Sequence, residues 1–256
     1  IERVHLLIAW ATNAYRYRAV LDYEAAQKRA KEALALTEEL GCTDELAMAL
    51  GALGEIYLWR GELSQARDVF CSHLEEVEQK AGLQMCAEIH RQLGRTLGFM
   101  GEYSRSIKYL KLAGQEYERV GHIRMLSACY LAIAYFYMQW DHWSDTFHSG
   151  MQCIELRRKH GLGPWLIPLM LARLHAARGD VEKSEKWQLD TLNEKEDLDP
   201  RMTSYMTALV SMARRDYATA CQILEEALTI ALSSIASDCV IYPYLAECAA
   251  RTGDEA

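Results

Sequence analysis

Proline is scarce in this sequence, and the scarcity limits which folds the chain can adopt. Only four of the 256 residues are proline. Because proline interrupts helices in their interior, a chain with so few can form long, uninterrupted helices. Leu, Ala, Glu and Arg are plentiful, and all four have high helix propensity. The composition therefore favours helices.

Long apolar runs and an excess of basic residues are also absent. No apolar run approaches the roughly 18 residues of a membrane-spanning helix, and no signal peptide is visible, so we expect no membrane partner. The formal net charge is −8. Binding to nucleic acid through its phosphates needs a basic surface, so this charge argues against direct nucleic-acid binding. With 50% hydrophobic and 25% charged residues, the composition is typical of a soluble globular protein.

The cysteines lack the spacing of a disulfide or metal framework. None of them forms a CxxC pair, and their neighbours in the sequence are apolar and helix-forming. We therefore expect free, buried thiols and a cytoplasmic location. The eight cysteines are Cys42, Cys71, Cys86, Cys129, Cys153, Cys221, Cys239 and Cys248.

Catalytic motifs are absent as well. The eight histidines form neither an HExxH motif nor a cluster with metal-ligand spacing, and there is no GxSxG, phosphate loop or GxGxxG. The segment Gly161–Pro164 superficially resembles a phosphate-binding loop, but apolar residues follow it, and we interpret it as a helix break. The sequence predicts no enzymatic activity, no cofactor and no metal site.

One stretch, residues 50–70, shows how the chain is organised. Its apolar and small residues fall at helical spacing on both sides of a Gly61-Glu62-Leu63 turn. The pattern predicts two helices joined as a hairpin, with Gly54 and Ala66 allowing the two backbones to approach closely.

The same pattern recurs along the whole chain. Turns begin at residues 21, 61, 101, 141, 179, 215 and 253, which are 36 to 40 residues apart. A small residue follows each turn at a fixed distance: Ala26, Ala66, Ser106, Thr146, Ser184 and Ala220. Another precedes each turn: Ala14, Gly54, Gly94, Ala134, Ala172, Ala208 and Ala246. A period of this length is the signature of a repeat protein.

These residues make the chain similar to the tetratricopeptide repeat (TPR) family. The clearest matches are Leu53, Gly54, Tyr57, Gly61, Ala66 and Phe70 in the second repeat, with Trp10, Ala14, Tyr17 and Ala26 in the first and Leu93, Gly94, Gly101, Tyr103 and Leu110 in the third. The resemblance implies an all-α fold, a right-handed α-solenoid of about six to seven stacked antiparallel helix pairs. We expect residues 1–256 to form a single such domain.

The period is longer than the 34 residues that are usual for the family. Gly41, Gly82, Gly121 and Gly161 follow their turns by a constant distance and are predicted to end the second helices as left-handed caps. Asp199-Pro200 is predicted to end the fifth second helix. Long repeats of this kind resemble the sensor domains of the maltose-regulon transcription activator and of bacterial signalling ATPases and nucleotide cyclases. The last unit begins at Gly253 and is incomplete, so we expect the chain to be part of a larger protein.

The resemblance also implies a concave groove lined by the first helix of each pair. Carried over position by position, it gives Tyr15, Arg18, Glu55, Trp59, Glu88, Arg91, Arg95, Phe99, Tyr135, Gln139, Arg173, Tyr205 and Met212. Arginines could hold a carboxylate or phosphate, and the aromatic residues would add apolar contact area. Alternatively, the arginines pair with Glu88, Glu55 and their neighbours, and the aromatic residues pack between repeats. The turn from Trp140 to Trp143 is a further candidate contact.

Two functions remain open. The first is a non-catalytic interaction module for signal transduction or transcription regulation, whose groove binds a peptide or protein partner, with an acidic partner as one candidate. The second is a domain that senses a small-molecule effector and controls self-association. An enclosed pocket would favour the second function, since small ligands need largely buried sites.

Overall fold

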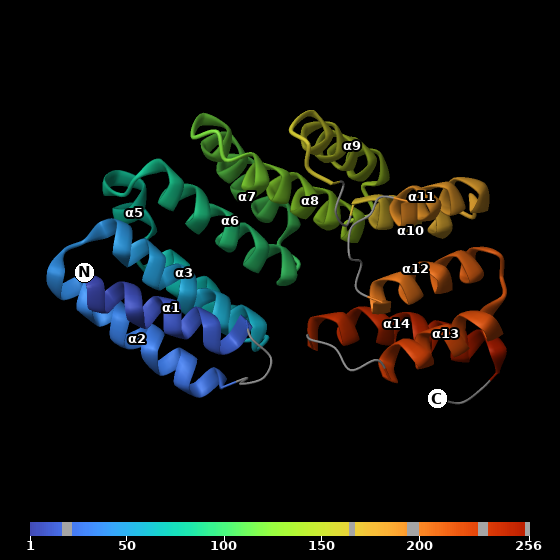
Figure 1. Ribbon diagram of the computed structural model, residues 1–256, viewed down its shortest axis with the longest axis horizontal. Helices are drawn as coiled ribbons and strands as arrows, with labels where there is room; N and C mark the ends of the chain where they lie inside the picture. The colour runs from blue at the N-terminus through green and yellow to red at the C-terminus, as the bar shows by residue number, and fades with distance from the viewer. Residues whose placement is uncertain (17–21, 164–166, 194–199, 230–234, 254–256) are drawn as a thin grey trace. The chain divides into compact units, whose positions relative to one another are not determined.

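The computed structural model describes residues 1–16, 22–163, 167–193, 200–229 and 235–253, and within these ranges the regular structure is entirely helical (Figure 1). The helices are α1 (Glu2–Arg16), α2 (Tyr23–Leu40), α3 (Thr43–Trp59), α4 (Leu63–Ser72), α5 (Leu74–Lys80), α6 (Leu83–Phe99), α7 (Tyr103–Arg119), α8 (Ile123–Gln139), α9 (Trp143–Lys159), α10 (Ile167–Ala177), α11 (Val181–Asn193), α12 (Pro200–Ala213), α13 (Tyr217–Thr229) and α14 (Ile235–Thr252).

The helices alternate with the predicted turns. The turns at 61, 101, 141, 179 and 215 fall between α3 and α4, α6 and α7, α8 and α9, α10 and α11, and α12 and α13. The turn at 21 lies outside the described residues, between α1 and α2, and Gly253 follows α14. The prediction of an all-α solenoid built from helix pairs is therefore confirmed.

The helices fall into two compact units, residues 1–142 and residues 143–256. In the first unit, α3 packs on α6 and α6 packs on both α7 and α8. In the second unit, α10 packs on α11 and α12, and α13 packs on α12 and α14. That the whole chain forms one continuous domain stays a prediction.

Small residues allow the helices of a pair to approach closely, as predicted. All six that follow a turn are fully buried. A Cβ added to Gly54 would lie 2.1 Å from Cζ of Phe70 on α4, so glycine is the only residue that fits there. Ala246 differs because its side chain is exposed and no helix is described beyond α14.

The turns require a left-handed backbone conformation. Gly61, Gly101 and Gly179 have φ values of 75°, 82° and 72°. Asp141 and Arg215 occupy the equivalent place with φ values of 58° and 63°, although side chains disfavour this region. The turn geometry is thus kept even where the glycine is lost.

One of the predicted left-handed caps is wrong, and the predicted end at Asp199 lies outside the described residues. Gly41, Gly121 and Gly161 have the predicted left-handed conformation, but Gly82 is extended, with φ −62°, and precedes α6. Its N–H donates a hydrogen bond to Oδ1 of Asp44 at 2.7 Å, which fixes it as the start of a helix. Pro200 is the first described residue of α12, where its missing N–H costs nothing.

The second helix of the second pair is interrupted at His73. Residue 73 has φ −126° and ψ 14°, and it separates α4 from α5. Its ring contacts Ser72 Oγ at 2.8 Å and Glu38 Oε1 at 3.3 Å. The sequence did not predict this break, because no proline or glycine marks it.

The thiols are less uniformly buried than predicted. All seven cysteines whose side chains are described are free. Cys86, Cys129, Cys153 and Cys248 are buried as expected, whereas Cys71 is exposed. Cys71 lies at the end of α4, just before the break, where its side chain faces solvent. None of the described helices is long and apolar enough to span a bilayer.

Candidate functional site

The first helices of successive pairs in the first unit carry eight of the predicted groove residues. α3 carries Glu55 and Trp59, and α8 carries Tyr135 and Gln139. Between these two helices lies α6, which contacts both and carries Glu88, Arg91, Arg95 and Phe99. We call this set of eight residues the α6 surface.

The remaining predicted residues are not part of this surface. Arg18 and the side chain of Tyr15 lie outside the described residues. Arg173, Tyr205 and Met212 belong to the second unit, on α10 and α12.

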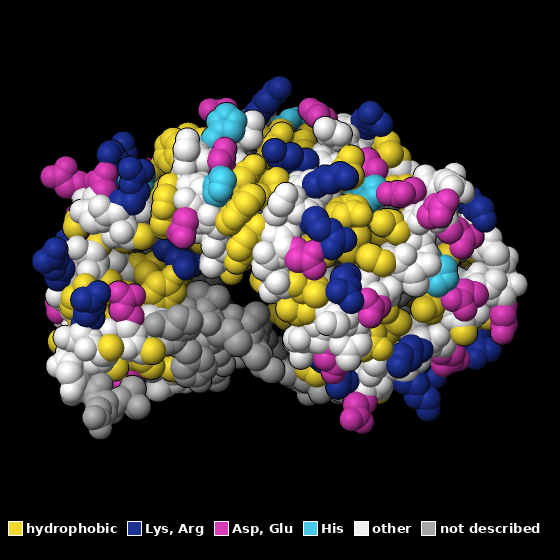
Figure 2. All heavy atoms as spheres, turned by 180° about the vertical axis from the view of Figure 1, so that it is seen from behind, with side chains coloured by type: hydrophobic (Ala, Val, Ile, Leu, Met, Phe, Trp, Pro, Cys, Tyr) yellow, Lys and Arg dark blue, Asp and Glu magenta, His cyan; other side chains and the backbone are white. Residues whose placement is uncertain are grey.

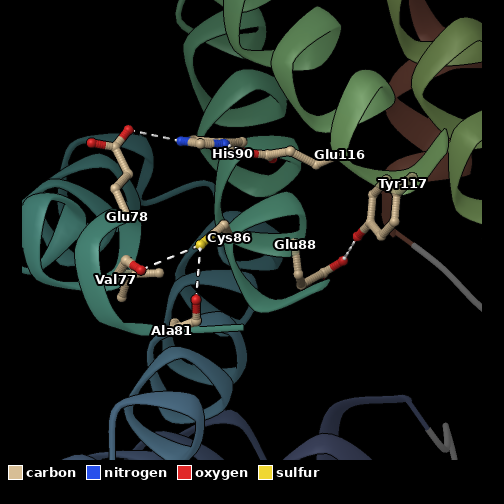
Figure 3. Close-up of polar contacts among 8 residues, drawn as sticks. All are labelled: Val77, Glu78, Ala81, Cys86, Glu88, His90, Glu116 and Tyr117. Atoms are coloured by element: carbon tan, nitrogen blue, oxygen red, sulfur yellow. Dashed lines mark hydrogen bonds and ion pairs between the residues drawn. The ribbon is translucent and has the colours of Figure 1, made fainter. Parts of the chain in front are cut away.

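Glu88 is the centre of a hydrogen-bond network on α6. Arg91 donates to both carboxylate oxygens, from Nε to Oε2 at 3.0 Å and from Nη2 to Oε1 at 2.5 Å. Gln92 Nε2 donates to Oε1 at 2.9 Å. Tyr117 on α7 donates from its hydroxyl to Oε2 at 2.6 Å, as Figure 3 shows. Four donors therefore satisfy the carboxylate, and one of them ties α6 to α7.

This network keeps the Glu88–Arg91 pair ionised. Burial acts to raise the pKa of Glu88, but the charge of Arg91 and the hydrogen bonds outweigh it, so the pKa is lowered. Burial likewise acts to lower the pKa of Arg91, and the Glu88 charge and hydrogen bonds raise it overall. For Tyr117, burial and the adjacent Glu88 charge both raise the pKa, so the phenol remains a donor.

Arg91 therefore pairs with Glu88, which was the alternative that the sequence left open. Only 14% of its side chain is exposed. The bidentate contact uses Nε and Nη2, and Nη1 makes no hydrogen bond to any residue that the structure describes. Arg95, one turn further on, donates from Nη1 to Oε1 of Gln92 at 2.9 Å. Arg91 is thus held in one orientation with one edge of its guanidinium still available.

The α6 surface also includes aromatic residues on α3, α6 and α8. Trp59 and Phe99 occupy the same place in their repeats, two residues before the turn, and are 37% and 48% exposed. The Phe99 ring centroid is 6.3 Å from that of Tyr135. Phe99 also meets Phe136 edge-on at 5.4 Å. The aromatic side chains pack on one another as the sequence alternative proposed, yet leave part of their rings exposed.

Trp140, in the turn that the sequence singled out, is also part of an aromatic cluster. Its ring stacks on His142 at 4.4 Å and contacts Tyr103 at 6.2 Å. With 40% of the residue exposed, Trp140 is anchored by these neighbours rather than extended into solvent.

Sequence reasoning missed His90, which lies next to this network (Figure 3). Its Nδ1 is 2.8 Å from Oε2 of Glu116 on α7, and its Nε2 is 2.9 Å from Oε1 of Glu78 on α5. Burial acts to lower the His90 pKa, but hydrogen bonds to the two carboxylates raise it overall. The partners are 26 and 12 residues away on other helices, so no local motif could have identified them.

In the second unit, Arg173 on α10 packs over an aromatic ring. Its Cζ lies 4.9 Å from the ring centroid of Tyr244 on α14. Tyr205 on α12 is buried and meets Tyr244 edge-on at 5.4 Å. Met212 packs beside this cluster. The family positions did not include Tyr244, because it lies nine residues before Gly253, at an offset that the groove pattern omits.

Both sets of residues combine arginine side chains with aromatic rings. Within the described ranges, no three His, Cys, Asp or Glu side chains gather as metal ligands would. Figure 2 shows Lys and Arg side chains interspersed with Asp and Glu side chains on the face in view, without a continuous basic tract. The side chains of the α6 surface offer hydrogen-bond donors and aromatic area instead.

Comparison with known proteins finds no family model that matches the sequence, and no curated protein that matches it. Solved structures do match. A signal transduction ATPase with numerous domains from Pyrococcus horikoshii, which has a tetratricopeptide repeat sensor, has a TM-score of 0.69 at 14% identity, covering 99% of this chain and 39% of that chain. RapI without ligand has a TM-score of 0.65 at 13% identity, covering 99% and 85%.

A third match is a Rap protein complexed with competence and sporulation factor, with a TM-score of 0.61 at 14% identity, covering 98% of this chain and 65% of that chain. At such identities the likeness establishes the fold. It agrees with the recurring turns, the buried small residues and the close helix contacts. The chain has the fold of the tetratricopeptide-repeat proteins, an α-solenoid of helix pairs.

Proposed function

We propose that this chain is a non-catalytic interaction module of a signalling or transcription-regulatory protein, and that the α6 surface binds a peptide or protein segment bearing a carboxylate. The observation that carries the proposal is the state of Arg91. Glu88 fixes the guanidinium, the aromatic rings of Trp59 and Phe99 are exposed on the same surface, and Nη1 still has donors to offer.

The chemistry of the partner follows from these groups. A guanidinium forms its strongest hydrogen bonds with a carboxylate, and one that is already oriented loses little conformational entropy on binding. Exposed aromatic residues are frequent anchors at protein interfaces. The partner is therefore an acidic side chain or C-terminal carboxylate accompanied by an apolar or aromatic residue.

The matched structures support a regulatory role. One contains a TPR sensor in a signal transduction ATPase, and another is a Rap protein in complex with competence and sporulation factor. The alternative of a small-molecule effector that controls self-association stays a prediction, as does the cytoplasmic location.

A displayed library of random peptides, selected on the 256-residue chain, tests the proposal. We expect enriched peptides to combine Asp or Glu with an aromatic residue. Binding of the best peptide, measured by isothermal titration calorimetry, should weaken at least about tenfold in Arg91→Lys and in Trp59→Ala, because each loses a central contact. Arg91→Lys keeps the charge but cannot hold Glu88 and a ligand at once.

The matched control is Arg105→Lys. Arg105 lies on α7 and pairs with Glu102, and its side chain is 55% exposed. This variant should bind like the unaltered chain. Enriched peptides without acidic residues, or equal affinity for all three variants, would refute the proposal.

A further inference from the structure

The second unit contains an arginine that has an aromatic support but no acceptor. Arg173 lies on α10, Tyr205 on α12 and Tyr244 on α14, the first helices of three successive pairs. α10 packs on α12, which places these side chains in one cluster. The cluster belongs to the second unit, so its properties do not depend on the α6 surface.

The guanidinium of Arg173 is half-buried. Among the residues that the structure describes, no carboxylate comes within ion-pair distance of it and no carbonyl accepts a hydrogen bond from it; its one recorded partner is the Tyr244 ring. An arginine side chain in a protein is always charged and carries five N–H donors. Half-burying such a group without an acceptor is unfavourable unless something else supplies one. Several surface arginines of this protein, including Arg3, Arg60, Arg105 and Arg214, have a carboxylate partner.

Tyr244 holds this arginine in place. The contact is with the face of the ring, an interaction in which the cation is attracted by the π-electrons. It consumes none of the N–H donors, which lie in the guanidinium plane. Tyr244 is itself fixed by the edge-on contact with the buried Tyr205. The arrangement therefore restricts Arg173 while leaving its donors unused, which is how a pre-organised anion site is built.

We propose that Arg173, supported by Tyr244, binds an oxyanion of a ligand, and that this oxyanion is a carboxylate or a phosphate. Both present two oxygens at the spacing of the guanidinium fork. The site is separate from the one proposed on α6, and either can fail without the other.

The test observes the arginine directly. In the 256-residue chain labelled with ¹⁵N, the Nε–H signal of Arg173 is assigned from Arg173→Lys and followed during titration. The probes are acetylglycine, which carries one carboxylate, inorganic phosphate, and acetylglycinamide as the neutral match. We expect a saturable shift with an oxyanion probe and none with acetylglycinamide.

Two variants distinguish binding at this site from a general effect of ionic strength on the spectrum. Tyr244→Leu should weaken binding of the oxyanion probe at least about fivefold, since the guanidinium loses its support. Arg178→Gln, which alters an exposed arginine just beyond α10, should leave the titration unchanged. Circular dichroism of each variant confirms that the helices are retained.

The possible outcomes are distinct. Saturation by acetylglycine alone supports a carboxylate ligand, and saturation by phosphate alone supports a phosphorylated one. A linear drift with all three probes, or an equal shift of the Arg178 signal, would overturn the proposal. So would binding by Tyr244→Leu at undiminished affinity.

Discussion

The ring of Phe136 on α8 lies directly against Gly98 on α6, so close that a Cβ at residue 98 would be 2.3 Å from its Cζ atom. This contact joins the first helices of two successive pairs within the first unit. It also positions Phe136 to support Phe99, which meets it edge-on. The packing of α6 on α8 and the exposed aromatic part of the α6 surface therefore depend on one glycine.

We expect Gly98→Ala to lower the free energy of unfolding by about 1–3 kcal/mol, because the methyl group forces the Phe136 ring or the helices to move. Urea denaturation followed by circular dichroism measures the change. Gly51→Ala is the matched control, since Gly51 is helical and a Cβ there would meet nothing within 4 Å. In that variant the free energy of unfolding should rise by about 0.5–1 kcal/mol, because alanine has a higher helix propensity than glycine. An equal change in the free energy of unfolding for Gly98→Ala and Gly51→Ala would contradict the close contact between Gly98 and Phe136.

At Arg215 a residue with a side chain occupies a turn position whose backbone conformation favours glycine. Its φ of 63° strains the backbone. Arg215→Gly should raise the free energy of unfolding by about 0.5 kcal/mol, because relief of this strain outweighs the greater freedom that glycine gives the unfolded chain. The converse change, Gly101→Arg, should lower it by about 1 kcal/mol. A Cβ at Gly101 would meet no atom within 4 Å, so the cost is purely conformational. Thermal melts of both variants measure these shifts, and a change of the same sign in both would refute the explanation.

Ser106 and Ser184 occupy the same place in different repeats but differ in hydrogen bonding. The Ser184 hydroxyl donates to the carbonyl of Ala172 at 2.9 Å, whereas the buried Ser106 hydroxyl has no partner among the described residues. Ser106→Ala should therefore stabilise the chain by about 1 kcal/mol, and Ser184→Ala should destabilise it by a similar amount. Chemical denaturation of the two variants gives the comparison. A loss of stability in Ser106→Ala would show that its hydroxyl is satisfied after all.

His90 should make stability depend on pH. It faces Glu78 on α5 and both Glu116 and the ring of Tyr109 on α7. Its pKa is raised in the folded state, so its stabilising effect is complete below the unfolded value of about 6.5 and disappears as pH rises through the folded pKa. His90→Gln should therefore cost about 1–3 kcal/mol at pH 6 and less at pH 9.

The titration itself can be observed by NMR of the histidine rings. His90 should titrate above the ordinary value. His175 should titrate below it, because burial lowers its pKa more than the nearby Asp180 raises it. His160→Gln, at an exposed position, is the control for the loss of an imidazole ring in the stability measurement. A His90 ring that titrates below 6.5 would contradict its hydrogen bonds to Glu78 and Glu116.

The features predictable from sequence were those set by local pattern. The turns, the buried small residues and the left-handed glycines follow a fixed period, so residues such as Gly54 and Gly101 could be placed from spacing alone. Gly82 could not, because its conformation depends on a hydrogen bond to Asp44 on another helix. The break at His73 likewise carries no proline or glycine signal.

For the candidate site, the sequence could assign residues to helices but not pair them. It placed Arg91 and Arg95 among the groove residues, and left open whether Arg91 would be paired. In the structure Arg91 pairs with Glu88 on its own helix, and Tyr117 adds a hydrogen bond to Glu88 that arises only when α7 packs on α6. Tyr244 was missed because tertiary contact, not repeat position, brings it to Arg173.

Glu88 receives one hydrogen bond from Tyr117 in the α6–α7 interface and two from Arg91 on its own helix. In the function proposed for the α6 surface, the carboxylate is shared between internal packing and ligand binding, and this sharing would couple the two thermodynamically. Any ligand that redistributes the hydrogen bonds of Arg91 alters the strength with which α7 is held. By reciprocity, a change in the docking of α7 alters affinity by the same factor. Hydrogen exchange of α7 amides, compared with and without a bound peptide, would register this coupling as a change in protection, and unchanged protection would exclude it.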